Sequence, residues 1–213
     1  MKKAFWAFGI LAFLGTTSAM AADVVPPAPA FNWAGPYVGV VGSYGFGTSN
    51  HTNAVGLSSG DFGMSGILGG LDFGFNRQSN NFVYGLEGDI ALSTDKGNSR
   101  SGVCGGGGCD TNLNWLSTAR ARVGFAKDNF LFFGTGGLAI AGMHADCCAS
   151  AGSVDSTRLG YTLGGGIEMA VSNHMTAKLQ YLYVNEGSIP YQFTVNADAS
   201  RNHIVSLGIN YKF

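Results

Sequence analysis

The sequence predicts a small transmembrane β-barrel, and three observations support this fold class: a secretory leader, a composition poor in charge and rich in glycine, and alternating segments of about ten residues. Charged residues make up 12% of the chain, where about 25% is usual for soluble domains. The 34 glycines are more than twice the average share. With 46% hydrophobic residues and no collagen-like repeat, the chain is neither disordered nor fibrous.

The N-terminus has the features of a signal peptide. Lys2 and Lys3 precede the apolar stretch AFWAFGILAFLG, and the small-residue motif AMA follows it. This pattern predicts a signal peptide at residues 1–21, with cleavage between Ala21 and Ala22. A membrane anchor is the alternative, but the apolar run is shorter than the about 20 residues that span a bilayer.

The mature chain divides into a lead-in and one domain. Residues 22–34 contain the Pro-rich stretch ADVVPPAPA, which predicts an extended periplasmic segment, and residues 35–213 suit a single domain. Removal of the leader changes the formal charge from −1 to −3, which does not indicate a nucleic-acid partner. The longest uncharged apolar stretch, Phe130–Met143, is too short for a membrane helix, so the domain can cross a bilayer only as a closed barrel.

Eight segments of the domain are predicted to be strands, most of them with a period of two. In FVYGLEGDIAL, for example, Phe82, Tyr84 and Leu86 alternate with Val83 and Gly85. The segment Phe130–Met143 is apolar on both faces near its start, so its register is not predicted. The segments are Tyr37–Gly47, Ser65–Asn76, Phe82–Leu92, Leu113–Ala126, Phe130–Met143, Arg158–Ala170, Met175–Val184 and His203–Phe213.

The connections between these segments alternate in length. Short links fall at Arg77–Asn81, Lys127–Asn129 and Val171–His174. Long links fall near residues 48–61, 94–112, 144–157 and 185–201. This alternation predicts an eight-stranded antiparallel up-and-down barrel with four long external loops.

Side-chain volume decides which face points outward. A soluble lipocalin-like barrel would place the apolar face inside, but the interior of eight strands is only wide enough for modest side chains. Bulky residues share the apolar face, and the opposite face is rich in Gly, Ser and Thr. The bulky residues are Phe73, Phe75, Trp115, Phe125, Tyr181 and Tyr183, with Leu113 on the same face as Trp115. We therefore expect the apolar face to contact lipid.

Charged residues on the small-residue face are expected to form an interior network. Glu87 and Asp89 lie five and seven residues from the turn end of their strand, and Arg122 and Arg120 lie four and six from theirs. These heights match on adjacent strands, so the carboxylates and guanidinium groups can pair. Pairing offsets the cost of desolvating buried charges. A general acid and base pair is the alternative, but no nucleophile, phosphate loop or metal motif accompanies the carboxylates, so an enzyme is not expected.

A second interior pair is expected across the short link at residues 171–174. Glu168 and Lys178 lie almost symmetrically about its centre. At the end of the chain, Tyr211 and Phe213 share the outward face, where they would join an aromatic girdle.

The segments resemble the small porin-like outer-membrane proteins of alphaproteobacteria, a family with RopB-type and hemin-binding-type members and an OmpA-like barrel. The similar motifs are NWAGPYVGVVGSYGFG, GGLDFGFNRQ, FVYGLEGDI, TARARVGFA, GTGGLAIAG, YTLGGGIE, LQYLYV and NYKF. The resemblance implies an outer-membrane location in a Gram-negative bacterium, immunogenic surface loops, and recognition of Tyr211 and Phe213 by the barrel-assembly machinery. Gln180 departs from the family pattern, where Glu is expected, which would weaken the network around Lys178 if that ion relies on its own strand.

Four cysteines fall in predicted external loops: Cys104, Cys109, Cys147 and Cys148. An even number in an exported protein predicts disulfides, with three connectivities open. A metal site that combines His144, Asp146 and the adjacent Cys147 and Cys148 is a weaker alternative, because structural zinc sites space their cysteines more widely.

The leading functional hypothesis is a structural and surface-interaction protein whose partners are outer-membrane lipid and ligands of its loops. A passive pore for small solutes is the second hypothesis, although the interior charges argue for a plugged lumen. Hemin capture by His51 or His144 is the third and rests on the family resemblance. No cofactor follows from the residues themselves.

Overall fold

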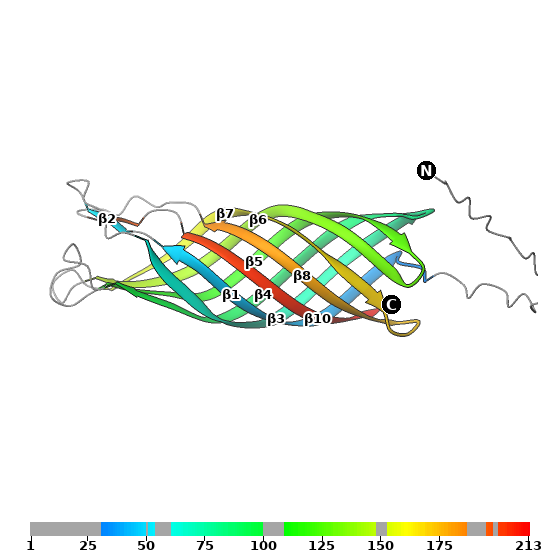
Figure 1. Cartoon of the computed structure of the whole chain (residues 1–213), viewed down its shortest axis with the longest axis horizontal. Coiled ribbons are helices and arrows are strands. Elements are labelled where there is room, and N and C mark those ends of the chain that lie inside the picture. The colour runs from blue at the N-terminus through cyan, green and yellow to red at the C-terminus, as the bar shows by residue number, and fades with distance from the viewer. Residues whose placement is uncertain are drawn as a thin grey trace, which may run out of the picture.

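The computed structural model describes residues 31–49, 51–53, 61–99, 109–147, 153–186, 195–197 and 200–213. Its main feature is a closed barrel of eight antiparallel strands in the ring order β1, β10, β8, β7, β6, β5, β4 and β3 (Figure 1). The strands are β1 (Gly35–Ser49), β3 (Phe62–Ser79), β4 (Phe82–Ser99), β5 (Cys109–Lys127), β6 (Phe130–Cys147), β7 (Ser153–Ala170), β8 (Met175–Glu186) and β10 (Ser200–Lys212). The predicted fold class is confirmed. Among the described residues, no helix has the length and hydropathy of a membrane span.

Short turns join the strands at one end of the barrel, here called the turn end, and the start of β1 and the C-terminus lie at this end (Figure 1). Asn80 and Asp128 open two of the turns with φ of 53° and 54°. Asn and Asp tolerate this left-handed conformation better than most residues. The third turn covers residues 171–174.

At the opposite end, here called the loop end, the strands are longer than the sequence predicts. Residues 94–112 are expected to be a loop, but β4 continues to Ser99 and pairs it with Cys109 of β5. Hydrogen bonding in a ladder needs no apolar side chains, so a hairpin can continue beyond the alternating apolar stretch. Two further short strands, β2 (His51–Asn53) and β9 (Val195–Ala197), form a separate two-stranded sheet within two stretches that were predicted as loops.

A β-bulge corrects the predicted position of Leu113. The alternation of β5 places Leu113 on the outward face with Trp115, but the β5–β6 register shifts between these two residues. A bulge adds one residue to a strand and so reverses which face the following side chains occupy. Leu113 is therefore buried inside the barrel, while Trp115 stays outside and packs on Gly142, where a Cβ atom would lie 2.0 Å from the indole nitrogen.

The bulky face points outward, as the side-chain volumes predict. Phe73, Phe75, Phe125 and Tyr181 are 42–54% exposed. Leu71, Leu86, Leu207 and many similar side chains on the same face are also exposed. The barrel thus carries an apolar band around its outside.

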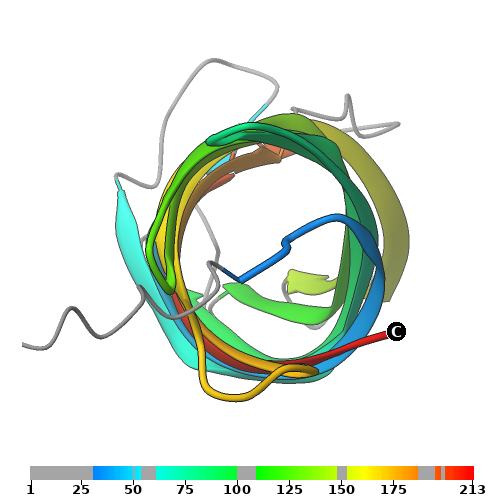
Figure 2. The same ribbon diagram turned by 90° about the vertical axis from the view of Figure 1, so that its right-hand side faces the viewer.

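An aromatic plug closes the turn end. Phe31 and Trp33 precede β1, and Trp33 is buried in a cluster with Ala126, Leu131 and Phe133. Figure 2 looks along the barrel from this end and shows the segment before β1, in dark blue, lying across the opening of the ring. The predicted lead-in includes residues 31–34, yet these residues fill part of the barrel. The plug also explains why the start of β6 is apolar on both faces: Leu131 and Phe133 point inward to meet Trp33.

Candidate functional site: the filled lumen

The carboxylate of Glu87 is the centre of a group of charges inside the barrel. Arg120 donates a hydrogen bond to its Oε1 atom at 2.5 Å, while Arg122 and Lys178 reach Oε2 at 3.2 Å and 3.0 Å. The Tyr37 hydroxyl donates to the same Oε2 atom at 2.6 Å. Glu87 is 2% exposed. One buried carboxylate therefore serves three cations.

Each of these cations also contacts a second carboxylate. The pairs are Arg120 with Asp89 at 2.9 Å, Arg122 with Glu168 at 2.8 Å, and Lys178 with Asp72. Thr118 donates to Asp89, while Thr176 and Asn210 donate to Glu168. We call this group, from Tyr37 to Asn210, the charged layer. It connects side chains from seven strands of the ring and satisfies most of its polar atoms internally, which is the condition for burying ions at acceptable cost.

All six charged residues selected from the sequence lie in this layer, but two details differ from expectation. The ladder places Glu87 directly opposite Arg120 and Asp89 opposite Thr118, so the strands are offset by two residues from the predicted pairing. The guanidinium of Arg120 is long enough to reach both carboxylates.

Glu168 and Lys178, the second expected pair, lie opposite each other in the ladder but do not form an ion pair in this structure. Glu168 lies directly across from Lys178 on β7 and β8. The Lys178 ammonium extends to Asp72 and Glu87 on the far strands instead, and Glu168 accepts from Arg122. The substitution of Gln180 for the expected Glu therefore does not deprive Lys178 of its partners.

Asp72 and Tyr37 also belong to the layer and are not among the interior residues predicted from the sequence. Asp72 lies between the outward residues Leu71 and Phe73, so strand alternation alone would have placed it inside. Tyr37 gives no comparable signal, because an inward aromatic needs space that only the neighbouring strand can provide. Gly74 provides it: a Cβ atom there would lie 2.4 Å from the Tyr37 hydroxyl oxygen.

Apolar side chains fill the lumen between the charged layer and the loop end. This apolar layer consists of Met64, Leu68, Ala91, Leu113, Leu116, Ala139, Ala141, Met143, Leu182, Val184 and Ile204. Where the two layers meet, a chamber of about 30 Å³ is lined by residues that include Asp72, Arg120, Gln180 and Ser206. This space has room for about one water molecule. Some buried polar residues lie level with this apolar layer, because the ladders pair Asp95 with Leu113 and Asn202 with Val184.

The candidate ligands at the loop end are spread over the barrel. His51 lies in β2, which follows β1, whereas His144 lies in β6, directly opposite β1 in the ring. The Nδ1 atom of His144 is 2.6 Å from Asp155 on β7. Within the described ranges, no three His, Cys, Asp or Glu side chains are grouped to hold a metal ion.

The proposed cysteines are only partly within the described structure. Cys109 begins β5 and Cys147 ends β6. Cys104 and Cys148 lie outside the described residues, as do the predicted signal peptide and its cleavage site between Ala21 and Ala22. The predicted cleavage therefore stays a prediction.

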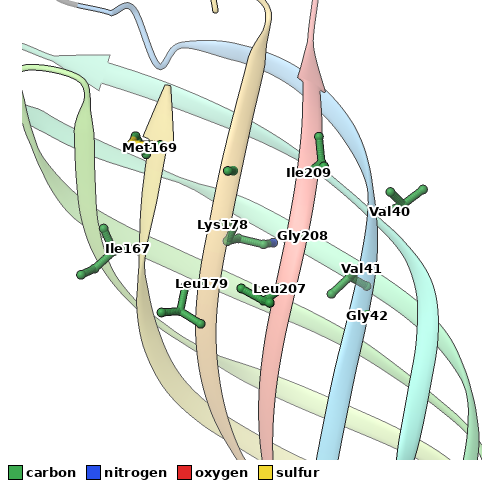
Figure 3. A pocket seen from close by; sticks show the side chains of 11 residues that line it. Val40, Val41, Gly42, Ile167, Met169, Lys178, Leu179, Leu207, Gly208 and Ile209 are labelled. Carbon is green, nitrogen blue, oxygen red and sulfur yellow. The ribbon is translucent and has the colours of Figure 1, made fainter. Parts of the chain in front are cut away.

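The outer surface is apolar and shallowly grooved. A groove of about 650 Å³ runs over β1, β10, β8 and β7, where Gly42 and Ala177 are small among larger neighbours such as Leu207 and Ile209 (Figure 3). Lys178 borders it, but its ammonium points into the barrel. Nearer the turn end, the rings of Tyr211 and Phe213 meet edge to face at 5.2 Å, on the exposed side of the last strand. This surface suits lipid rather than water.

Comparisons with known proteins agree with this architecture. Residues 9–213 match the family described as outer membrane protein beta-barrel domain. The chain is 35% identical to the 31 kDa outer-membrane immunogenic protein of Brucella melitensis, over 95% of this chain and 97% of the relative. It is 34% identical to a 22 kDa outer membrane protein of Rhizobium leguminosarum, over 90% and 83% respectively. The solved structure of OprG from Pseudomonas aeruginosa shares the fold, with a TM-score of 0.60 at 15% identity, over 84% of this chain and 96% of OprG.

Proposed function

The chain belongs to the outer-membrane β-barrel protein family, and we propose that it is a sealed barrel that supports the envelope and presents its loop end at the cell surface. Proteins of this class keep their short turns in the periplasm and their longer connections outside. The turn end with the aromatic plug therefore faces the periplasm. The C-terminal residues Tyr211 and Phe213 would be read by the barrel-assembly machinery.

The observation that carries this proposal is the filling of the lumen by two successive layers. An ion entering from the periplasm would meet the aromatic plug and then the charged layer, where Glu87 would have to separate from its three cations. Removing one partner from a buried ion pair costs about 3–5 kcal/mol. Beyond this layer, the ion would meet the packed side chains of the apolar layer.

The same arrangement favours a structural role over catalysis. Each carboxylate of the charged layer is paired with at least one cation and is covered on both sides, so it is not open to a substrate. The activity that remains available to the chain lies at its loop end and on its lipid-facing surface.

Conductance through planar bilayers tests the seal. The folded protein, checked by its changed electrophoretic mobility without boiling, should give no stable channel steps, whereas a wide porin measured in parallel should. Swelling of vesicles in small sugars is an independent readout of the same property. A stable conductance of porin size would overturn the proposal and favour the passive pore.

Complementation can separate envelope support from surface interaction. A strain that lacks the protein should lose resistance to detergent, and the wild-type chain should restore it. A chain in which residues 54–60 and 187–194 are shortened should restore detergent resistance equally if the barrel itself supports the envelope. Failure of the shortened, correctly inserted chain would contradict support by the barrel.

A further inference from the structure

A cluster of aromatic rings lies on the outer surface near the loop end, over β1, β10 and β8. At its centre is His203 on β10, which the ladders pair with Phe46 of β1 and Tyr183 of β8. The centroid of the His203 ring is 5.5 Å from that of Phe46 and 5.4 Å from that of Tyr183. The Tyr181 hydroxyl oxygen lies 2.6 Å from the Nδ1 atom of His203. The rings form one continuous surface, which we call the aromatic patch, and its members are Tyr44, Phe46, Tyr181, Tyr183 and His203.

The aromatic patch lies between an apolar and a polar part of the same three strands. Toward the turn end, the ladder pairs Gly42 with Leu207, and both residues line the apolar groove (Figure 3). Toward the loop end, the next outward rung pairs Arg201 with Thr48 of β1 and Asn185 of β8. The outward side chains therefore change from apolar to aromatic to polar. This is also the order of groups along a lipid molecule, from its acyl chains to its headgroup.

Arg201 is the charged group beside the patch. Its side chain is exposed, and its two ladder neighbours, Thr48 and Asn185, are neutral. Successive outward side chains of one strand are about 6.5 Å apart, so the guanidinium of Arg201 can reach a group that rests on the ring of His203. A guanidinium binds phosphate through two parallel hydrogen bonds. The charge at this site therefore favours a phosphate ester.

The aromatic patch favours a sugar next to that phosphate. Tyrosine has an apolar ring and a hydroxyl that can donate and accept hydrogen bonds, which suits it to the boundary between lipid and water. A sugar ring has C–H groups on its faces and hydroxyls around its edge, so the patch can contact both. The headgroup of a glycerol phospholipid has no such ring and would use Arg201 alone.

We propose that this surface binds a lipid whose headgroup is a phosphorylated sugar, with the phosphate at Arg201 and the sugar against the aromatic patch. The acyl chains follow the same strands toward the groove. A lipid is the expected occupant because the patch is continuous with the apolar band that faces the membrane. The assignment of this lipid to the external leaflet rests on the orientation given in the proposed function, whereas the site itself does not.

Native mass spectrometry of the folded protein in detergent tests the site. The probe is an acylated glucosamine disaccharide that carries phosphate, and it is compared with its dephosphorylated form and with phosphatidylglycerol. We expect the phosphorylated glycolipid to be retained about tenfold better than either, the difference expected for one hydrogen bond to a charged group. Equal retention of the dephosphorylated form would overturn the role of Arg201, and equal retention of phosphatidylglycerol would overturn the preference for a sugar.

Variants locate the site on the barrel. Arg201→Gln should lower the retention of the phosphorylated glycolipid about tenfold. The matched control is Arg77→Gln, because Arg77 is also exposed but lies near the turn end of β3. The control should bind like the wild type, and an equal loss in both variants would contradict the proposal.

Conductance of the same samples separates this inference from the proposed function. Binding in detergent depends neither on the orientation of the barrel nor on its lumen. A conducting barrel that still retains the glycolipid would contradict only the seal. A closed barrel that does not retain it would contradict only the lipid site.

Discussion

The two halves of the lumen are filled in different ways. Toward the turn end, the charged layer holds ions that depend on one another, with Glu87 shared by Arg120, Arg122 and Lys178. Toward the loop end, apolar side chains such as Leu116 and Leu182 predominate, and they pack without directional bonds. A shift of strand register by two residues would leave several buried charges unpaired in the first half, whereas the second half would lose mainly packing. We infer that the charged layer specifies the register and that the apolar layer mainly excludes water.

The largest expected effect is that of Glu87→Ala, because three buried cations lose the carboxylate that they share. The free energy of unfolding should fall by about 4 kcal/mol, within the range for breaking a buried ion pair. Reversible urea unfolding of the protein in lipid vesicles, followed by tryptophan emission, measures this change. Glu87→Gln is the control, since it keeps the size of the side chain and some hydrogen bonds and should cost less. A loss below about 1 kcal/mol for Glu87→Ala would show that the charges do not act as one network.

A smaller effect is expected on the apolar side from Leu182→Ala, because it creates a cavity among packed neighbours. The loss should be about 3 kcal/mol, as for other buried leucines. Leu179 provides a matched control, since it lies on the same strand but faces lipid and is 50% exposed. Leu179→Ala should cost at least about 1 kcal/mol less, because lipid can fill the space that the leucine leaves. Equal losses in the same urea experiment would argue that the external half of the lumen is loosely packed.

The smallest effect is expected at the boundary between the layers, from Gln180→Leu. The Gln180 side-chain oxygen has no hydrogen-bond partner among the described residues, and its side chain borders the small chamber. Replacement of a buried amide whose oxygen is unpaired by an apolar group of similar size should change the free energy of unfolding by less than about 1 kcal/mol. A decrease of more than about 2 kcal/mol would instead show that Gln180 makes stabilising polar contacts with the charged layer.

The sequence predicts most of the barrel because the relevant signals are local. The alternation around Glu87 shows both the strand and the inward face, since a period of two assigns every side chain of a regular strand to one side. The same rule is wrong for Leu113, where a bulge inserts one residue, and such a bulge depends on the partner strand. It also does not predict the strand extensions to Ser99 and Cys147, because ladder bonds form between backbones whatever the side chains are.

The amino-acid sequence by itself determined the fold class, the outward face, and six of the ions that the lumen contains, because strand period and side-chain volume are properties of short segments. Only the tertiary structure decided which ions meet. Lys178 lies opposite Glu168 on the neighbouring strand, yet it pairs with Asp72 and Glu87 across the barrel. Closing the ring brings the far strands within reach of a long side chain, and their distance depends on the shear of the whole barrel. The same holds for Trp33, whose burial at the turn end depends on strands that follow it much later in the chain.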